Sequence, residues 1–124
     1  QEFLSLGWIQ NLPRLVASQS EAAAPITHAF MKGLVDIEPE VARPTVAESI
    51  QVGNPVSLGW RALAALRESK GTAVALSDEE ILEAQSLTAR LAGIFAEPAA
   101  AGYFAESSAA GYSAESSAAW SSSA

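Results

Sequence analysis

The segment from residue 71 to residue 93 constrains the fold most, because a β-leaning run leads there directly into a capped helix. The run Thr72–Leu76 follows a glycine and stops at Ser77, as a short buried strand would. Ser77 and Glu80 are spaced as a capping box, in which both side chains accept from free backbone N–H groups, and Gly93 is placed to end the helix. One apolar stripe follows at spacings of three and four: Ile81, Ala84, Thr88 and Leu91. We predict a strand over residues 72–76 and a helix that starts at Asp78.

Weaker patterns extend this unit on its N-terminal side. The apolar run Leu15–Ser18 follows turn-forming residues and predicts a second buried strand. Helical spacing of Trp60, Leu63 and Leu66 predicts a helix before Gly71. The segment 44–52 could form another helix, and 35–40 indicates a loop. The order of helix, glycine turn, strand and capped helix is typical of an α/β domain with a layered parallel sheet.

Composition and charge exclude several classes of function. The 124 residues carry seven Lys plus Arg and fourteen Asp plus Glu, a net charge of −7 that repels nucleic-acid phosphates and anionic membranes. The chain has no cysteine and one histidine, so it cannot form a disulfide framework, a thiol nucleophile or a Cys-ligated zinc site. No apolar run approaches the roughly 18 residues of a membrane span, and the N-terminus lacks a secretory signal. We expect a cytoplasmic protein that binds neither nucleic acid nor membranes.

The composition changes near residue 98, after which Ala, Ser, Gly and Glu dominate. Residues 101–109 and 110–118 are near copies of one nine-residue unit, too short and too few to stack as a solenoid. Such a sequence offers little large apolar surface to offset the entropy of ordering. We therefore divide the chain into a globular segment, 1–101, and a tail, 102–124, that is low in complexity and either disordered, weakly helical or misassigned.

Few residues indicate chemistry by their type alone. His28 has no recognisable triad around it, and we interpret it as a surface or helix-end residue. Lys32 and Lys70 are the two candidates for a Schiff base, although a solvated charge is the simpler interpretation of each. Three acids at the start of the predicted helix suit its positive end rather than a metal ion: Glu79, Glu80 and Glu83. These patterns alone predict no catalytic residue and no metal site.

Two clusters are more suggestive. The segment Gln51–Pro55 combines a flexible glycine, a polar asparagine and a rigid proline, which suits a loop that approaches a ligand, although a plain turn has the same composition. Glu97 follows the short apolar element Ile94–Ala96, and the ends of core elements are where open α/β sheets bind ligands. A surface acid is the alternative interpretation of Glu97.

Three motifs together resemble the later half of the threonine synthase family, which depends on pyridoxal phosphate. They are the segments 43–57 (RPTVAESIQVGNPVS), 77–82 (SDEEIL) and 93–99 (GIFAEPA), and the resemblance covers roughly residues 3–101. It implies an α/β fold: a partial layered parallel sheet with flanking helices, from the large domain of a fold-type II enzyme, followed by the low-complexity tail.

The resemblance also implies an activity and a set of site residues. Threonine synthases convert O-phosphohomoserine and water to threonine and phosphate. Glu97 and Ala100 match the family segment that faces the cofactor, although Ala100 stands where the family usually has serine. Gly53, Asn54 and Pro55 match the family loop near the active-site entrance. The Schiff-base lysine and the phosphate cradle of the family have no counterpart in this chain, so we expect it to be inactive alone.

Two functional interpretations follow. The chain is a segment of a threonine synthase that acts on a small-molecule substrate together with the missing remainder of the enzyme, or it is a non-catalytic α/β scaffold or interaction module derived from the same fold. A short parallel sheet without flanking strands exposes apolar edges, so we expect self-association or association with that remainder.

Overall fold

The computed structural model describes residues 1–109 and places two strands and several helices there. In chain order the elements are α1 (Glu2–Ser5), β1 (Val16–Ser20), α2 (Pro25–Met31), the 3-10 turns η1 (Glu48–Ile50) and η2 (Val56–Leu58), α3 (Gly59–Glu68), β2 (Thr72–Leu76), α4 (Asp78–Ala92) and α5 (Pro98–Ala109). No helix among these residues has the length and apolar character that crossing a membrane requires.

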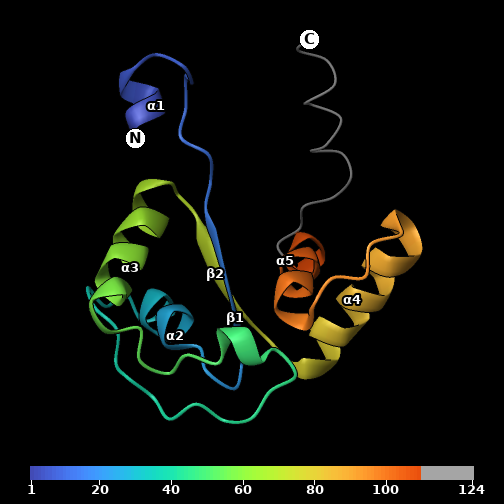
Figure 1. The fold of residues 1–124 in the computed structure, drawn as a ribbon. Helices are drawn as coiled ribbons and strands as arrows, with labels where there is room; N and C mark the ends of the chain where they lie inside the picture. Colours follow the sequence, from blue (N-terminus) through green and yellow to red (C-terminus); the bar gives the residue numbers. More distant parts are fainter. Residues whose placement is uncertain (110–124) are drawn as a thin grey trace.

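The two strands form one parallel sheet between helices. Val16 pairs with Thr72, and the register continues to the pair Ser20 and Leu76. Figure 1 shows α2 and α3 on one side of the strands and α4 and α5 on the other, with α1 apart from them near the amino ends of the strands. The predicted α/β class, with a small parallel sheet and flanking helices, is confirmed.

Helix α4 and the strand before it follow the predicted pattern. The Ser77 hydroxyl accepts from the Glu80 amide at 3.2 Å, and the Ser77 amide donates to the Glu80 carboxylate at 2.8 Å, which completes the capping box. Gly93 ends the helix in the left-handed conformation, with φ of 68°. Ile81, Ala84 and Thr88 of the stripe are buried. Leu91 is 79% exposed, because the last turn of α4 extends beyond the surface that the helix packs on.

Two local predictions are wrong. Residues 44–52 contain only the turn η1, because side chains compete with the backbone there: the Thr45 hydroxyl accepts from the Ala47 amide, and a carboxylate of α4 accepts from the Val46 amide. The apolar element 94–96 is not part of the core, since Ile94 is 58% exposed and Phe95 82%. The helix predicted before Gly71 is confirmed as α3, in which Leu63 and Leu66 are buried and Trp60 is 52% exposed.

The strand β1 extends further than its apolar run suggests. It continues through Gln19 and Ser20, which are polar but buried. The Gln19 side-chain oxygen accepts from the amides of Ile26 and Thr27 at the start of α2, so its burial leaves no acceptor unsatisfied. Helix α2 begins at Pro25, a residue suited to a first turn, and was not predicted.

Helix α5 crosses the boundary expected between residues 101 and 102. Ala101 is fully buried and Ala105 nearly so, and a Cβ added to Gly102 would lie 3.4 Å from the Ser18 hydroxyl of β1. Small side chains thus let α5 approach the sheet closely, which the low-complexity composition does not suggest. The rest of the predicted tail, 110–124, lies outside the described residues.

Candidate functional site

The carboxyl ends of β1 and β2 meet at one edge of the sheet, which is where open α/β sheets bind ligands. The loop 43–47 crosses this edge and joins the two strand ends through side chains. The Ser20 hydroxyl donates to the Thr45 hydroxyl at 3.0 Å, and that hydroxyl donates to an Asp78 carboxylate oxygen at 2.5 Å. The other Asp78 oxygen accepts from the Val46 amide at 3.2 Å. The edge is therefore tied together by hydroxyl and carboxylate groups.

Arg43 fastens the start of this loop. Its guanidinium donates to the Glu21 carbonyl at 2.8 Å, its amide donates to the Ala22 carbonyl at 2.9 Å, and its carbonyl accepts from the Gln51 side chain at 2.7 Å. A depression of about 240 Å³ lies beside it, lined by Ser20, Glu21, Ala22, Arg43, Pro44, Ser77, Asp78 and Glu79. Three carboxylates and one guanidinium in this lining make it unsuitable for a phosphate group.

Glu97 lies beside the turn η1. It immediately precedes α5, its carbonyl accepts from the Ala101 amide at 2.9 Å, and its carboxylate accepts from the Ser49 hydroxyl at 3.3 Å. A second depression, of about 300 Å³, is lined by Val46, Ala47, Glu48, Ser49, Glu97, Pro98 and Ala99. Ala100 follows in the first turn of α5 and is half-buried. The structure thus brings the predicted Glu97 together with a serine that sequence patterns did not single out.

The predicted loop Gly53–Pro55 packs on a different partner. The Gly53 carbonyl accepts from the Glu40 amide at 3.0 Å, and a Cβ at Gly53 would overlap the Glu40 backbone oxygen. The Asn54 side chain accepts from the Val56 amide at 3.0 Å, and the Pro55 carbonyl accepts from the Leu58 amide at 3.1 Å. This close backbone approach explains the glycine.

Val56 has a positive φ of 50°, which is unusual for a β-branched residue. Strained backbone of this kind costs roughly 1–3 kcal/mol and tends to occur at functional sites. The strain lies immediately after Gly53–Pro55, so it adds to the observations that mark this loop.

The lysines and the histidine lie away from Glu97. Lys32 is ion-paired with Glu38 at 3.0 Å, both side chains being exposed. Lys70 lies before β2, at the amino end of the sheet. The His28 ring is 2.9 Å from the Glu40 carboxylate, whose other oxygen accepts from the Ala24 amide at the start of α2. Residues 1–109 hold no group of three side chains that could bind a metal ion.

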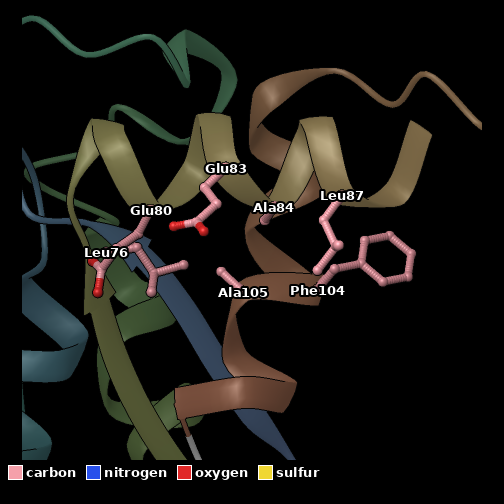
Figure 2. Close-up of a pocket in the computed structure, with 7 residues that line it drawn as sticks. All are labelled: Leu76, Glu80, Glu83, Ala84, Leu87, Phe104 and Ala105. Carbon is pink, nitrogen blue, oxygen red and sulfur yellow. The ribbon is translucent and has the colours of Figure 1, made fainter. Parts of the chain in front are cut away.

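A groove of about 410 Å³ lies between α4 and α5, away from these groups. Figure 2 shows Leu76, Ala84 and Ala105 along it, with Glu80 and Glu83 on one side. Leu87 and Phe104 lie together at the other side of the groove. Glu80 is engaged in the capping box, so Glu83 is the one other carboxylate of a lining that is otherwise apolar.

Sequence reasoning missed the groups that organise the edge: Ser20, Thr45, Ser49 and Asp78. The sequence accounts for Asp78 by its place at the start of a helix, where an acid stabilises the positive end of the helix dipole. Its bonds to the loop 43–47 were therefore not expected. No local pattern marks the other three, because their partners lie between 25 and 48 residues away in the sequence.

Comparisons with known proteins agree on one family. The family described as pyridoxal-phosphate dependent enzyme matches residues 2–118. Threonine synthase of Methanosarcina acetivorans is 48% identical over 101 residues, which are 82% of this chain and 25% of the relative. Threonine synthase of Methanocaldococcus jannaschii is 46% identical, and that of Mycobacterium tuberculosis 44%, each over 101 residues and 25% of the relative. The chain spans about a quarter of the length of these curated relatives.

A solved structure supports the same fold. The crystal structure of the T.th. threonine deaminase superposes with a TM-score of 0.63 and 21% sequence identity, covering 90% of this chain and 38% of that one. The fold, the family match and the relatives therefore coincide with the motifs that the sequence carries. The chain belongs to the pyridoxal-phosphate dependent enzyme family.

Proposed function

We propose that this chain is a segment of a threonine synthase, which converts O-phosphohomoserine and water to threonine and phosphate with pyridoxal phosphate. The observation that carries the proposal is the similarity to threonine synthases, which are up to 48% identical over 101 residues, and the structure adds the pair of Ser49 and Glu97 beside the start of α5. A non-catalytic scaffold is not favoured, because the relatives described above are themselves threonine synthases.

The residues present fit one side of the cofactor. Ser49 is the one side-chain donor to Glu97 within the described part of the chain, which leaves a carboxylate oxygen for a ligand. Ala47 and Ala99 leave room beside it, since neither side chain extends beyond a methyl group. We propose that Glu97 and Ala100 form part of the wall against the cofactor ring, with Gly53, Asn54 and Pro55 near the entrance.

The same residues do not fit the cofactor phosphate or its covalent attachment. The depression beside Arg43 is too acidic for a phosphate, Lys32 is ion-paired, and Lys70 lies at the opposite end of the sheet. We propose that the phosphate cradle and the attaching lysine belong to the remainder of the enzyme, so that this chain alone is inactive.

Within the complete enzyme, pyridoxal phosphate supplies a ring that delocalises the negative charge developed during elimination of phosphate and addition of water. The contribution that we propose for this chain is a carboxylate that would lie beside that ring. Glu97 is an exposed side chain whose carboxylate accepts one hydrogen bond, from the Ser49 hydroxyl at 3.3 Å, and this bond favours one orientation of its charge.

The proposal includes association and location. Phe3, Leu6 and Trp8 around α1 are exposed, with Trp8 at 71%. We propose that the remainder of the enzyme or a second copy covers them, and that the enzyme is cytoplasmic and binds neither nucleic acid nor membranes. Sedimentation of the purified chain tests the second copy: a monodisperse monomer would exclude it and would leave the remainder of the enzyme as the partner.

Segment replacement tests the proposed activity. The 101 matched residues of the Methanosarcina acetivorans enzyme are replaced by their counterparts here, and phosphate release from O-phosphohomoserine is measured with cofactor absorbance. The chimera should release phosphate, and Glu97→Gln should lower kcat by on the order of a hundredfold, because a preorganised charge next to the ring is lost.

Glu83→Gln provides the matched control, because it removes an exposed carboxylate from α4 outside the proposed wall. Its kcat should equal that of the unmodified chimera. A folded, cofactor-loaded chimera that releases no phosphate would contradict the proposal, as would full activity of the Glu97→Gln variant.

A further inference from the structure

The hydroxyl groups at the carboxyl edge donate in one direction along a chain of hydrogen bonds, and the Asp78 carboxylate is the last acceptor. Ser20 is 1% exposed, and its hydroxyl accepts from the Ala22 amide and donates to Thr45. The Thr45 hydroxyl accepts from Ser20 and from the Ala47 amide, and it donates to Asp78. Each hydroxyl has one proton, and both protons point toward the carboxylate. The charge of Asp78 therefore orders the whole chain of bonds.

Asp78 is not required to cap α4. Ser77 and Glu80 already satisfy the first turn through the capping box. The two oxygens of Asp78 instead accept from Thr45 and from the Val46 amide, both in the crossing loop. An acid at this position would stabilise the helix start by its charge alone, so its two bonds to the loop indicate an additional role.

The loop that Asp78 holds leads directly to Glu97. Ala47 is 1% exposed and packs in a core cluster with Leu76, Ile81 and Ala99, which fixes the loop on its inner side. The Ile50 amide donates to the Ala47 carbonyl at 3.1 Å, which closes the turn η1. That turn presents the Ser49 hydroxyl to Glu97. The position of Ser49 thus depends on bonds made two to four residues earlier.

We propose that Asp78 is a positioning residue of this enzyme, which sets the orientation of the Ser49 hydroxyl on Glu97 through Thr45 and Val46. Asp78 acts through the loop and is not itself a catalytic residue. The inference rests on the proposed function only where it treats Glu97 as part of the cofactor wall. The link from Asp78 to Ser49 and Glu97 stands on the geometry of this chain.

Nuclear magnetic resonance on the 124-residue chain tests the link without any activity measurement. Asp78→Asn keeps the shape but leaves one acceptor oxygen for two donors. Exchange of the Val46 amide with solvent should become faster by on the order of tenfold, the usual worth of one bond to a charged group. The carboxyl carbon resonance of Glu97 should move toward its position in a Ser49→Ala variant, in which the Ser49 donor is absent.

Glu79→Gln is the matched control, because it removes a charge from the same turn of α4, and the Glu79 side chain makes no hydrogen bond to the loop 43–47 in the described part of the chain. It should leave both signals unchanged. A second pair of variants guards against a general loss of structure: Thr45→Val should reproduce the effect of Asp78→Asn, and Thr45→Ser should restore the original signals.

The outcomes separate the two proposals. If the Glu97 resonance stays in place in Asp78→Asn and in Thr45→Val, the positioning role is overturned, whatever the exchange rate of Val46. If the resonance moves as expected, the positioning role is supported, and the same substitution in the active chimera should shift the visible absorbance of the bound cofactor. An unshifted band would then contradict the proposed place of Glu97 in the cofactor wall. An inactive unmodified chimera counts against the proposed function alone, because the resonance experiment still decides the link.

Discussion

The two ends of the sheet are built differently. At the amino end, every bond between the two strand starts has a backbone partner: the Thr72 amide donates to the Leu15 carbonyl at 3.0 Å, the Leu15 amide donates to the Ser69 hydroxyl at 3.2 Å, and the Arg14 guanidinium donates to the Lys70 carbonyl at 3.1 Å. At the carboxyl end, the joining is done by the side chains of Ser20, Thr45 and Asp78. Figure 1 shows the long connection from α2 to α3 and the starts of α4 and α5 at this second end.

This difference indicates that the two ends of the sheet have different roles. A backbone group is present at every position, so bonds that have a backbone partner, as at the amino end, place fewer requirements on the sequence than bonds between two side chains. Side-chain bonds at the carboxyl end tie particular residues to particular neighbours and thereby orient Ser49 and Glu97. Substitutions at the amino end should therefore change stability, whereas those at the carboxyl end should change the arrangement of the site.

The largest expected effect is at the amino end. A Cβ at Gly71 would overlap the Leu15 backbone oxygen, which pairs with the Thr72 amide. Gly71→Ala must separate the two strands where they begin, and we expect a loss of roughly 3 kcal/mol in the free energy of unfolding. Urea denaturation followed by circular dichroism measures this loss.

Gly102→Ala is the control for that substitution. An added Cβ meets nothing closer than 3.4 Å, and alanine is a better helix former than glycine, so this variant should gain up to about 1 kcal/mol. Equal stability of the Gly71→Ala and Gly102→Ala variants would show that the amino end does not depend on close backbone approach.

A smaller loss is expected from the equivalent change near the carboxyl end. A Cβ at Gly53 would overlap the Glu40 backbone oxygen, but Gly53 lies in a loop that can move away. Gly53→Ala should cost about 2 kcal/mol, less than Gly71→Ala, because the strain is relieved by displacement of the loop. The Glu40 amide, which donates to the Gly53 carbonyl, should exchange faster with solvent in this variant, and an unchanged rate would contradict the expected displacement.

The contrast between α4 and α5 explains why the sequence predicts one helix and not the other. Helix α4 has its signals within its own residues: a capping box, a periodic stripe and a terminal glycine. Helix α5 is specified by contact with the sheet, where Ala101, Gly102 and Ala105 fit because they are small. A run of small residues looks like low complexity until the surface that it packs on is known.

The residues of the candidate site also differ in whether a local sequence pattern indicates them. Glu97 and the loop 53–55 could be proposed as site residues because the motifs carrying them are contiguous and resemble a known family. Ser49 and Asp78 have roles that arise only when the loop 43–47 crosses the sheet edge, and no spacing in the sequence indicates this crossing. Long-range side-chain partners are thus the part of the site that a single sequence does not reveal.

Each end also holds one residue with a positive φ that is not glycine. Val56 has φ of 50° in the loop after Pro55, and Lys70 has φ of 53° after α3, where it completes a Schellman motif with Gly71. Val56→Gly should raise the free energy of unfolding by about 1 kcal/mol, because a β-branched side chain is most strained in this conformation. Lys70→Gly should raise it by about half as much. Thermal melting compares the two, and a larger gain for Lys70→Gly would place the greater strain at the amino end.

The smallest expected effect concerns Lys32, which is ion-paired with Glu38, both side chains being exposed to solvent. Exposed pairs of this kind contribute little, so Lys32→Met should change the free energy of unfolding by no more than about 0.5 kcal/mol. In the active chimera the same substitution should leave the visible absorbance of the cofactor unchanged, since a lysine that attaches the cofactor could not be replaced without losing that band. Loss of the band in Lys32→Met would assign the attachment to this chain and would overturn the view that its carboxyl end supplies only a wall for the cofactor.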